Sequence, residues 1–265
     1  MTYTLAIHGA AGRMGQRLIA LGSQHADFRI IAAIDHAQHV ALGRDAGSVA
    51  GVQPLDVKLT ADWPAAVDVA IDFSVPLACS AAVRHCLEKR IPLVVATTGL
   101  NTVQIAEVKE AAKSIPLCWA PSMSLAVNLT MKLAQQAARA LQQVPQGVDV
   151  EIIERHHRFK EDAPSGTALK FGEIIAAEMG LTEPVHGREG QCGQRTRNEI
   201  GYHAVRTGDN PGEHTIVFGM LGELIELRVA ASNRDCYASG ALAAAKFLIG
   251  KPAGLYNMFD VLGIA

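Results

Sequence analysis

The stretch GAAGRMG, residues 9–15, limits the possible folds of this chain more than any other. It follows an alternating, β-favouring run from Thr2 to His8 and leads into apolar residues at helical spacing from Met14 onwards. The pattern predicts a strand, a glycine turn and a helix. A helix that begins at such a turn points unpaired N–H groups toward it, and glycines there let a pyrophosphate approach the backbone.

A carboxylate at the right spacing supports dinucleotide binding. The predicted second strand, Arg29 to Ile34, ends in Asp35, 20 positions after Gly15. In the dinucleotide-binding fold a carboxylate at that place binds the ribose hydroxyls. The glycine motif alone is a weak signal, because Ala11 replaces the middle glycine and a tight structural turn needs similar residues. The strand, the helix and Asp35 together favour a dinucleotide site.

The rest of the first half continues the pattern of a doubly wound parallel sheet. Short apolar runs, typical of buried parallel strands, occur at 67–73, 91–96 and 116–120. Ligands bind at the carboxyl ends of such strands. We therefore expect Phe73, Ser74 and the run 97–99 to line the cofactor cleft. The alternative is that Phe73 and Ser74 form only a strand-to-helix turn.

From Val148 onwards the sequence is rich in strands, with one helix between them. The expected strands are 149–154, 200–206, 214–220 and 223–230. This order predicts an α+β domain with a mostly antiparallel sheet. The chain as a whole is therefore predicted to be α/β. A Rossmann-type dinucleotide-binding domain spans 1–124, with 235–265 packing back on it, and the second, α+β domain spans 125–234.

The segment ERHHRFKEDAPSGTAL, residues 154–169, indicates chemistry on a small acidic substrate. Its cationic residues precede a helix start at 165–167, and cations beside a helix start favour an anion. His156, His157 and Lys160 add groups able to donate protons near neutral pH. The alternative is a solvated charged face. Adjacent histidines in a strand face opposite ways, so we expect no shared metal ion.

Composition excludes several other classes of protein. The 24 basic and 26 acidic residues nearly cancel, which does not favour a nucleic-acid or membrane-surface partner. The five cysteines are odd in number and contain no CxxC pair, which argues against a disulfide framework and a structural zinc site. No apolar run is long enough to span a membrane. We expect a cytoplasmic protein with reduced thiols.

The two motifs together resemble the 4-hydroxy-tetrahydrodipicolinate reductase family, the dihydrodipicolinate reductases of lysine and diaminopimelate biosynthesis. The resemblance covers essentially the whole chain and includes ATTG at 96–99, REG at 188–190 and RTGDNPGEHTIVF at 206–218. It implies reduction of 4-hydroxy-tetrahydrodipicolinate to tetrahydrodipicolinate by NAD(P)H, with loss of water. It also implies a homotetramer assembled through the substrate domains.

The resemblance also assigns roles to individual residues. It implies His156 and Lys160 as the catalytic residues, His157 as substrate-binding, and Gly166 and Thr167 as donors to a substrate carboxylate. The helix start adds Ser165 to the substrate-binding residues. The expected cofactor-binding residues are Gly9, Ala10, Ala11, Gly12, Arg13, Met14, Asp35, Phe73, Ala96, Thr97, Thr98, Ala120, Pro121, Ser122 and Met123. Which of the two catalytic residues donates the proton stays open.

Two departures from the family pattern concern the cofactor. The residue after Asp35 is often Arg in the family, and here it is His36. An arginine would bind a 2′-phosphate, whereas a neutral histidine beside a carboxylate would not. We predict a preference for NADH over NADPH, although Arg13 can still supply a cation. Ser122 and Met123 stand where the family often has Asn and Phe.

Two other functions compete with this one. The first is another NAD(P)H-dependent reductase, such as an amino-acid or semialdehyde dehydrogenase; the acylating type needs a cysteine nucleophile, and no cysteine here lies in such a motif. The second is a non-catalytic protein that senses a dinucleotide, because a fold does not determine a function. The intact set of His156, His157 and Lys160 argues against the second.

Overall fold

The computed structural model describes residues 1–264, which fold into two compact units. Unit 1 contains Met1–Leu125 and the C-terminal segment from Arg234, and unit 2 contains Ala126–Asn233. The chain thus leaves the first unit after its sixth strand and returns to it for its last helices. Among the described residues, no helix is long and apolar enough to cross a membrane.

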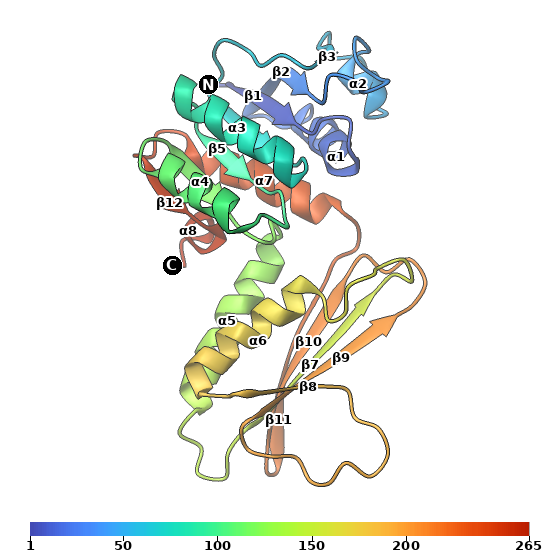
Figure 1. The fold of residues 1–265 in the computed structure, drawn as a ribbon, viewed down its shortest axis with the longest axis vertical. Coiled ribbons are helices and arrows are strands. Elements are labelled where there is room, and N and C mark those ends of the chain that lie inside the picture. The colour runs from blue at the N-terminus through green and yellow to red at the C-terminus, as the bar shows by residue number, and fades with distance from the viewer. Residues whose placement is uncertain (265) are drawn as a thin grey trace. The chain divides into compact units, whose positions relative to one another are not determined.

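Unit 1 is a seven-stranded sheet in which every pairing is parallel, in the order β12-β6-β5-β4-β1-β2-β3 (Figure 1). Its strands are β1 Tyr3–His8, β2 Phe28–Ile34, β3 Leu59–Thr60, β4 Val69–Asp72, β5 Leu93–Val95, β6 Pro116–Trp119 and β12 Gly254–Tyr256. Its helices are α1 Arg13–Gly22, α2 Ala46–Val49, α3 Pro76–Lys89, α4 Thr102–Ala112, α7 Asp235–Leu248 and α8 Met258–Leu262. The predicted Rossmann-type sheet is confirmed, and its strand order reverses between β1 and β4, where such folds bind ligands.

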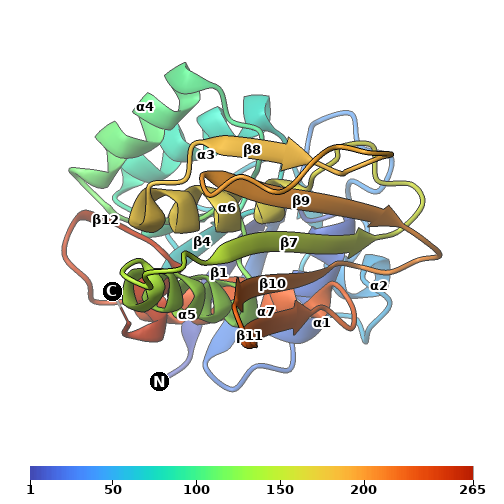
Figure 2. The same cartoon turned by 90° about the horizontal axis from the view of Figure 1, so that it is seen from below.

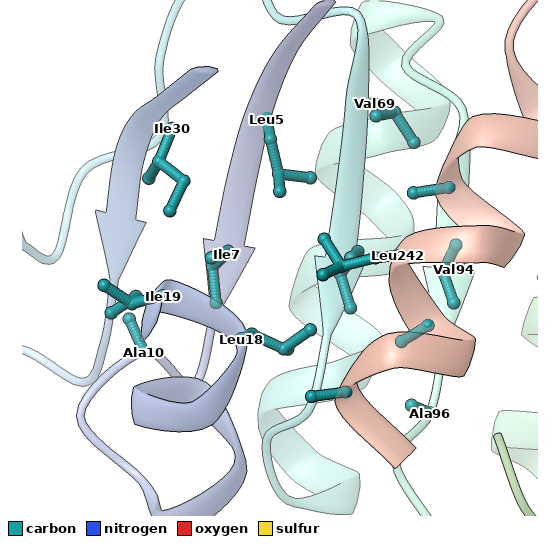
Figure 3. Close-up of a cluster of buried hydrophobic side chains, with 14 of the residues drawn as sticks. Leu5, Ile7, Ala10, Leu18, Ile19, Ile30, Val69, Val94, Ala96 and Leu242 are labelled. Carbon is teal, nitrogen blue, oxygen red and sulfur yellow. The ribbon is translucent and has the colours of Figure 1, made fainter. Parts of the chain in front are cut away.

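Two apolar layers enclose this sheet because buried side chains alternate along β1. Leu5 and Ile7 face a cluster that includes Leu18 of α1 and Leu242 of α7 (Figure 3). Ala6 belongs to a second cluster on the opposite face, with residues of α3 and α4. Each fully buried Leu or Ile contributes roughly 1.5–3 kcal/mol relative to exposure. These layers hold the carboxyl ends of the strands rigidly at one edge of the sheet.

Unit 2 has a five-stranded sheet in the order β11-β10-β7-β9-β8. Figure 2 shows these strands side by side, from β8 at the top to β11 at the bottom. Its elements are α5 Leu125–Leu141, β7 Asp149–His156, α6 Gly166–Met179, β8 Glu183–His186, β9 Glu199–Arg206, β10 Glu213–Met220 and β11 Glu223–Ala230. Both helices lie on one face of the sheet (Figures 1 and 2). The four predicted strands are all present, and β11 has the predicted bounds.

The prediction of a mostly antiparallel sheet is wrong, because the sheet is mixed. β10 pairs antiparallel with β7 and β11, whereas β9 pairs parallel with β7 and β8. The chain leaves β7 through α6 before it forms β8 and β9, and a helical crossover returns it in the parallel direction. The sequence pattern missed β8, a four-residue edge strand that contains Pro184, a residue tolerated at sheet edges.

The two faces of β7 have different roles. Val150, Ile152, Glu154 and His156 alternate along the strand and are buried. The intervening residues face the other side, where Glu151 forms ion pairs with arginines 188 and 195 and with His203. A buried carboxylate and a buried histidine therefore lie on the face that carries the apolar core of the unit.

Candidate active site

A pocket of about 540 Å³ opens in unit 1 at the carboxyl ends of β1, β2, β4 and β5. Nine of the predicted cofactor-binding residues line it: Gly9, Gly12, Arg13, Met14, Asp35, Phe73, Ala96, Thr97 and Thr98. Ser74 and His36 line it as well, and so do His8, His39 and Ala78, which the sequence analysis did not select. The pocket lies where the strand order reverses, between the glycine turn and the start of α3.

The glycine turn fits a dinucleotide pyrophosphate. Gly9 has a φ of +76°, and a Cβ built on it would lie 2.5 Å from the carbonyl oxygen of Phe73. Only glycine can occupy that position. The close approach of the turn to the end of β4 brings the start of α1 to the pocket wall, where its unpaired N–H groups can bind an anion.

Asp35 is held at the edge of this pocket by two backbone groups. Its Oδ2 accepts a hydrogen bond from the N–H of Ala11 (2.8 Å), and its Oδ1 accepts one from the N–H of His36 (2.9 Å). Ala10 and Ala11 are buried behind the turn and do not line the pocket. Each carboxylate oxygen has a second lone pair, so Asp35 can still accept hydrogen bonds from ribose hydroxyls.

The predicted residues 120–123 follow β6, two strands away from β4 in the sheet. Ala120 and Met123 are buried, Pro121 is exposed, and none of the four residues lines the pocket. Their contact with the cofactor stays a prediction. The structure therefore brings together the residues at the ends of β1, β2, β4 and β5 and does not place those after β6 in this pocket.

A buried polar cluster lies beside the pocket, and the sequence analysis did not select two of its members, His8 and Asp72. The ring nitrogen Nδ1 of His8 is 2.6 Å from Oδ1 of Asp72, whose oxygens also accept hydrogen bonds from the hydroxyls of Ser74 (2.6 Å) and Thr97 (2.7 Å). Asp72 is fully buried. Burial opposes its ionisation, but the bonds from His8, Ser74 and Thr97 outweigh burial and hold the pKa of Asp72 below its ordinary value. The signal in the sequence was a polar residue at the end of each of two apolar strands.

In unit 2 the predicted catalytic residue His156 is the last residue of β7 and is 7% exposed. Its Nδ1 lies 2.6 Å from Oε2 of Glu154, which is fully buried. Arg206 of β9 donates to both oxygens of Glu154, at 2.8 Å each. The predicted histidine is therefore one member of a charged cluster that spans two strands.

The predicted helix start at Ser165 is confirmed as the N-cap of α6. The Ser165 hydroxyl accepts a hydrogen bond from the N–H of Ala168 (3.1 Å) and lies 3.0 Å from Nε2 of His214. Its own N–H donates to Oε1 of Glu154 (3.0 Å). Because Ser165 is buried and engaged in these contacts, the N–H groups of Gly166 and Thr167 are the accessible donors at this helix start.

The remaining predicted residues of this segment are partly exposed. The ammonium group of Lys160 lies 2.7 Å from Oδ1 of Asp162, and the side chain of Lys160 is 21% exposed. His157 is half-buried, and its Nδ1 is buried without a hydrogen-bond partner among the described residues. A buried, unpaired ring nitrogen suits the binding of a polar ligand.

Sequence reasoning missed three members of this cluster: Glu154, Arg206 and His214. The T-shaped rings of His156 and His214 are 5.3 Å apart, and burial lowers the pKa of His214 to about 4. His214 is therefore neutral near pH 7. The pattern Glu-x-His within a predicted strand was a usable signal for Glu154, because residues two apart lie on one face. Within residues 1–264 no three His, Cys, Asp or Glu side chains gather as a metal site requires.

Comparison with known proteins identifies the chain in both halves. A family model described as dihydrodipicolinate reductase, N-terminus, matches residues 3–123, and one described as dihydrodipicolinate reductase, C-terminus, matches residues 126–262. The chain is 62% identical to the 4-hydroxy-tetrahydrodipicolinate reductase of Rhodopirellula baltica, covering 99% of this chain and 96% of that protein. It is 45% identical to the protein of the same name from Alkalilimnicola ehrlichii, covering all of both chains.

A solved structure agrees with this result. The dipicolinate-bound dihydrodipicolinate reductase from Paenisporosarcina sp. TG-14 is 26% identical, with a TM-score of 0.79, and the match covers 98% of this chain and 99% of that one. Both the sequence and the fold are thus similar along the entire length.

Proposed function

This chain belongs to the dihydrodipicolinate reductase family and reduces 4-hydroxy-tetrahydrodipicolinate with NAD(P)H, and we propose that it divides this reaction between its two units. Unit 1, predicted as 1–124 with 235–265, binds the dinucleotide. Unit 2, predicted as 125–234, binds the substrate and forms the oligomer. The reaction belongs to the diaminopimelate route to lysine.

We propose that the start of α6 holds a substrate carboxylate. The N–H groups of Gly166 and Thr167 and the Thr167 hydroxyl donate to the carboxylate, and His157 and Lys160 add polar contacts beside it. A charge-assisted hydrogen bond contributes about 1.5–3 kcal/mol. Ser165 was predicted to contact the substrate directly; its capping contacts support the additional role of fixing this helix start.

The pairing of His156 with the buried Glu154 carries the catalytic proposal. When bound, the reduced nicotinamide supplies a hydride to C4 of the substrate ring after water is lost. Negative charge then develops toward the ring nitrogen, so the enzyme must place a proton donor there. We assign that role to His156, because imidazole is the side chain whose ordinary pKa lies closest to neutral pH, and assign charge stabilisation to the cation of Lys160.

For the cofactor we propose a preference for NADH over NADPH. The support is the carboxylate of Asp35, held at the pocket edge beside His36. A fixed negative charge repels the 2′-phosphate of NADPH but accepts hydrogen bonds from the ribose hydroxyls of NADH. Steady-state kinetics with both cofactors tests this proposal, and a higher kcat/KM for NADPH would contradict it.

We further propose a homotetramer that assembles through unit 2. The apolar side chains of Val205, Leu221, Leu224 and Ile225 are exposed on or beside β9 and β11, where a protein surface usually carries polar groups. Sedimentation velocity on the purified chain tests this directly, and a monomer at micromolar concentration would contradict it.

A cytoplasmic location is also proposed. All five cysteines are free thiols, and Cys79, Cys86 and Cys118 are buried. Free thiols without disulfides are typical of proteins in a reducing compartment. Fractionation of the source cells with an antibody against the chain tests this proposal.

The decisive test of the function mixes the purified chain with NADH and freshly generated substrate and follows the loss of reduced-cofactor absorbance. Turnover is expected, and its absence would favour a dinucleotide-sensing protein. The double variant His156→Ala with Lys160→Ala should lose several orders of magnitude in kcat, since each proton-transfer group typically contributes about 10²–10⁴-fold. An unchanged kcat would remove both residues from the mechanism.

A further inference from the structure

The carboxylate of Glu154 connects the two parts of the proposed substrate site. It is fully buried and makes four hydrogen bonds: to Nδ1 of His156, to two nitrogens of Arg206 and to the N–H of Ser165. His156 is the proposed proton donor, and Ser165 caps the helix that is proposed to hold the substrate. The Glu154 side chain thus sets the position of the His156 ring relative to the start of α6.

We propose that Glu154 is a positioning residue of the reaction, which holds the His156 ring by Nδ1 so that Nε2 is the nitrogen that serves the substrate. This inference rests on the proposed function and extends it to a residue that itself contacts no reacting atom. The geometry follows from the strand, because residues 154 and 156 project from the same face of β7.

The charge of Glu154 determines which ring nitrogen carries a hydrogen. Burial opposes ionisation of this carboxyl, but Arg206, His156 and the Ser165 N–H outweigh burial and hold the pKa of Glu154 below its ordinary value. An ionised carboxylate only accepts hydrogen bonds. Nδ1 of His156 must therefore carry a hydrogen, and proton exchange with a ligand takes place at Nε2.

The surroundings of Nε2 agree with this role. Within residues 1–264 the ring of His156 makes no hydrogen bond through Nε2. The residue next to Nε2 is Gly212, with a φ of +147°, and a Cβ built there would lie 2.9 Å from Nε2. A glycine at this point leaves room for a ligand atom that any other residue would restrict.

Glu154 also affects the pKa of His156, in the direction opposite to the other groups around the ring. Burial lowers the pKa of His156, and Lys160 of the following loop and Arg206 of β9 lower it further. His214 of β10 is neutral and adds no charge near pH 7. Against these effects, Glu154 on β7 raises the pKa of His156. Loss of its charge leaves the ring less protonated at a given pH.

The test compares Glu154→Gln and Glu154→Asp with the control Glu151→Gln. Glu151 lies on the same strand but the opposite face, and it also contacts a histidine and arginines. For Glu154→Gln we expect kcat to fall about 10²-fold, the KM for NADH to stay unchanged, and the pH above which kcat declines to move down by about one unit. Glu154→Asp retains the charge, so its pH profile should stay near that of the wild type while kcat falls about tenfold.

The control Glu151→Gln should keep the wild-type kcat and pH profile. A folded Glu154→Gln enzyme with wild-type kcat and an unmoved pH profile would overturn the proposal. An equal shift in the pH profile of Glu151→Gln would also overturn it, because the effect would then not be specific to the site.

A measurement on the wild-type enzyme keeps the proposal testable if Glu154→Gln does not fold. Nitrogen-15 NMR of histidine-labelled protein, assigned with a His156→Gln variant, reports which ring nitrogen of His156 carries hydrogen in the neutral form. We expect Nδ1, and hydrogen on Nε2 alone would overturn the proposal. Failure of the proposed function is separate, because an enzyme without turnover can still show the Nδ1-bound hydrogen.

Discussion

Two histidine–carboxylate pairs, one in each unit, share a geometry but differ in their neighbours. His8 with Asp72 in unit 1 and His156 with Glu154 in unit 2 both have an Nδ1–oxygen distance of 2.6 Å to a fully buried carboxylate. The carboxylate of Asp72 also accepts hydrogen bonds from two neutral hydroxyls, whereas that of Glu154 also accepts them from the guanidinium of Arg206.

The neighbours indicate what each pair does. The bonds of Asp72 connect the ends of β1, β4 and β5, which together form one wall of the cofactor pocket. The bonds of Glu154 connect a ring with a free Nε2 to the start of a helix. We therefore propose that a histidine–carboxylate pair maintains the shape of a pocket in unit 1 and presents a proton-transfer group in unit 2.

The largest expected contrast is in turnover. His156→Asn should lower kcat by about 10²–10⁴-fold, because it removes a proton donor. His8→Asn should leave kcat within about threefold and raise the KM for NADH, because it disturbs only the pocket wall. Steady-state kinetics on both variants checks this, and equal losses of kcat would erase the distinction between the pairs.

A second contrast is in stability. Asp72→Asn should lower the free energy of unfolding by about 2–4 kcal/mol, because it leaves His8, Ser74 and Thr97 with a mismatched buried partner. The control Asp27→Asn weakens a partly exposed ion pair with Lys246 and a longer one with His25, and should have a much smaller effect. Urea unfolding of each variant, followed by tryptophan fluorescence, gives the comparison. Equal midpoints would show that the buried cluster contributes little.

The third contrast is in the response to acid. His156 packs against His214, whereas His8 packs against Trp63, which does not titrate. Burial lowers the folded-state pKa of His214 to about 4 from an ordinary value of about 6.5. As pH falls between these values the unfolded chain binds a proton that the folded chain does not bind, so stability decreases, by about 3 kcal/mol in total. Below about pH 4 both states bind the proton and the loss stops.

His214→Asn should remove most of this slope. Hydrogen exchange of β10 at pH 7, 6 and 5 measures the effect within unit 2, and the strands of unit 1 serve as the internal reference. A slope that persists in the variant would mean that another group causes the acid response.

The smallest expected effect concerns cofactor choice. His36→Arg introduces a permanent cation at the pocket edge and should shift the ratio of kcat/KM values toward NADPH by about tenfold, or about 1.4 kcal/mol. Arg90→Lys, on an exposed surface away from the pocket, is the matched control and should leave the ratio unchanged. A ratio that does not move in His36→Arg would mean that Arg13 already binds the phosphate.

Local signals predicted much of both sites. The strand before Gly9, the helix from Arg13 and the carboxylate of Asp35 follow from periodicity and spacing within 30 residues. The cap at Ser165 follows from its position before an apolar helix. Such features depend on backbone sterics and hydrogen bonds between near neighbours, which a sequence pattern records directly.

The pairing of strands that lie far apart in the sequence did not follow from those local signals. The short strands β3, β8 and β12 form because a neighbouring strand offers hydrogen bonds. Each has only two to four residues, too few for a periodic pattern that would predict a strand from the sequence. The direction of β9 depended on the α6 crossover, so the sheet is mixed where the order of predicted elements indicated mostly antiparallel strands.

By itself the sequence determined the dinucleotide fold of the first unit and the position of the helix start at Ser165, and it predicted His156 and Lys160 as the catalytic residues. Only the tertiary structure decided that Asp72 meets His8 across 64 positions and that Arg206 meets Glu154 across 52. A buried charge must find its partner wherever the fold brings one within hydrogen-bond distance. That partner depends on strand order and register. These are properties of the whole chain and cannot be predicted from the sequence around either residue.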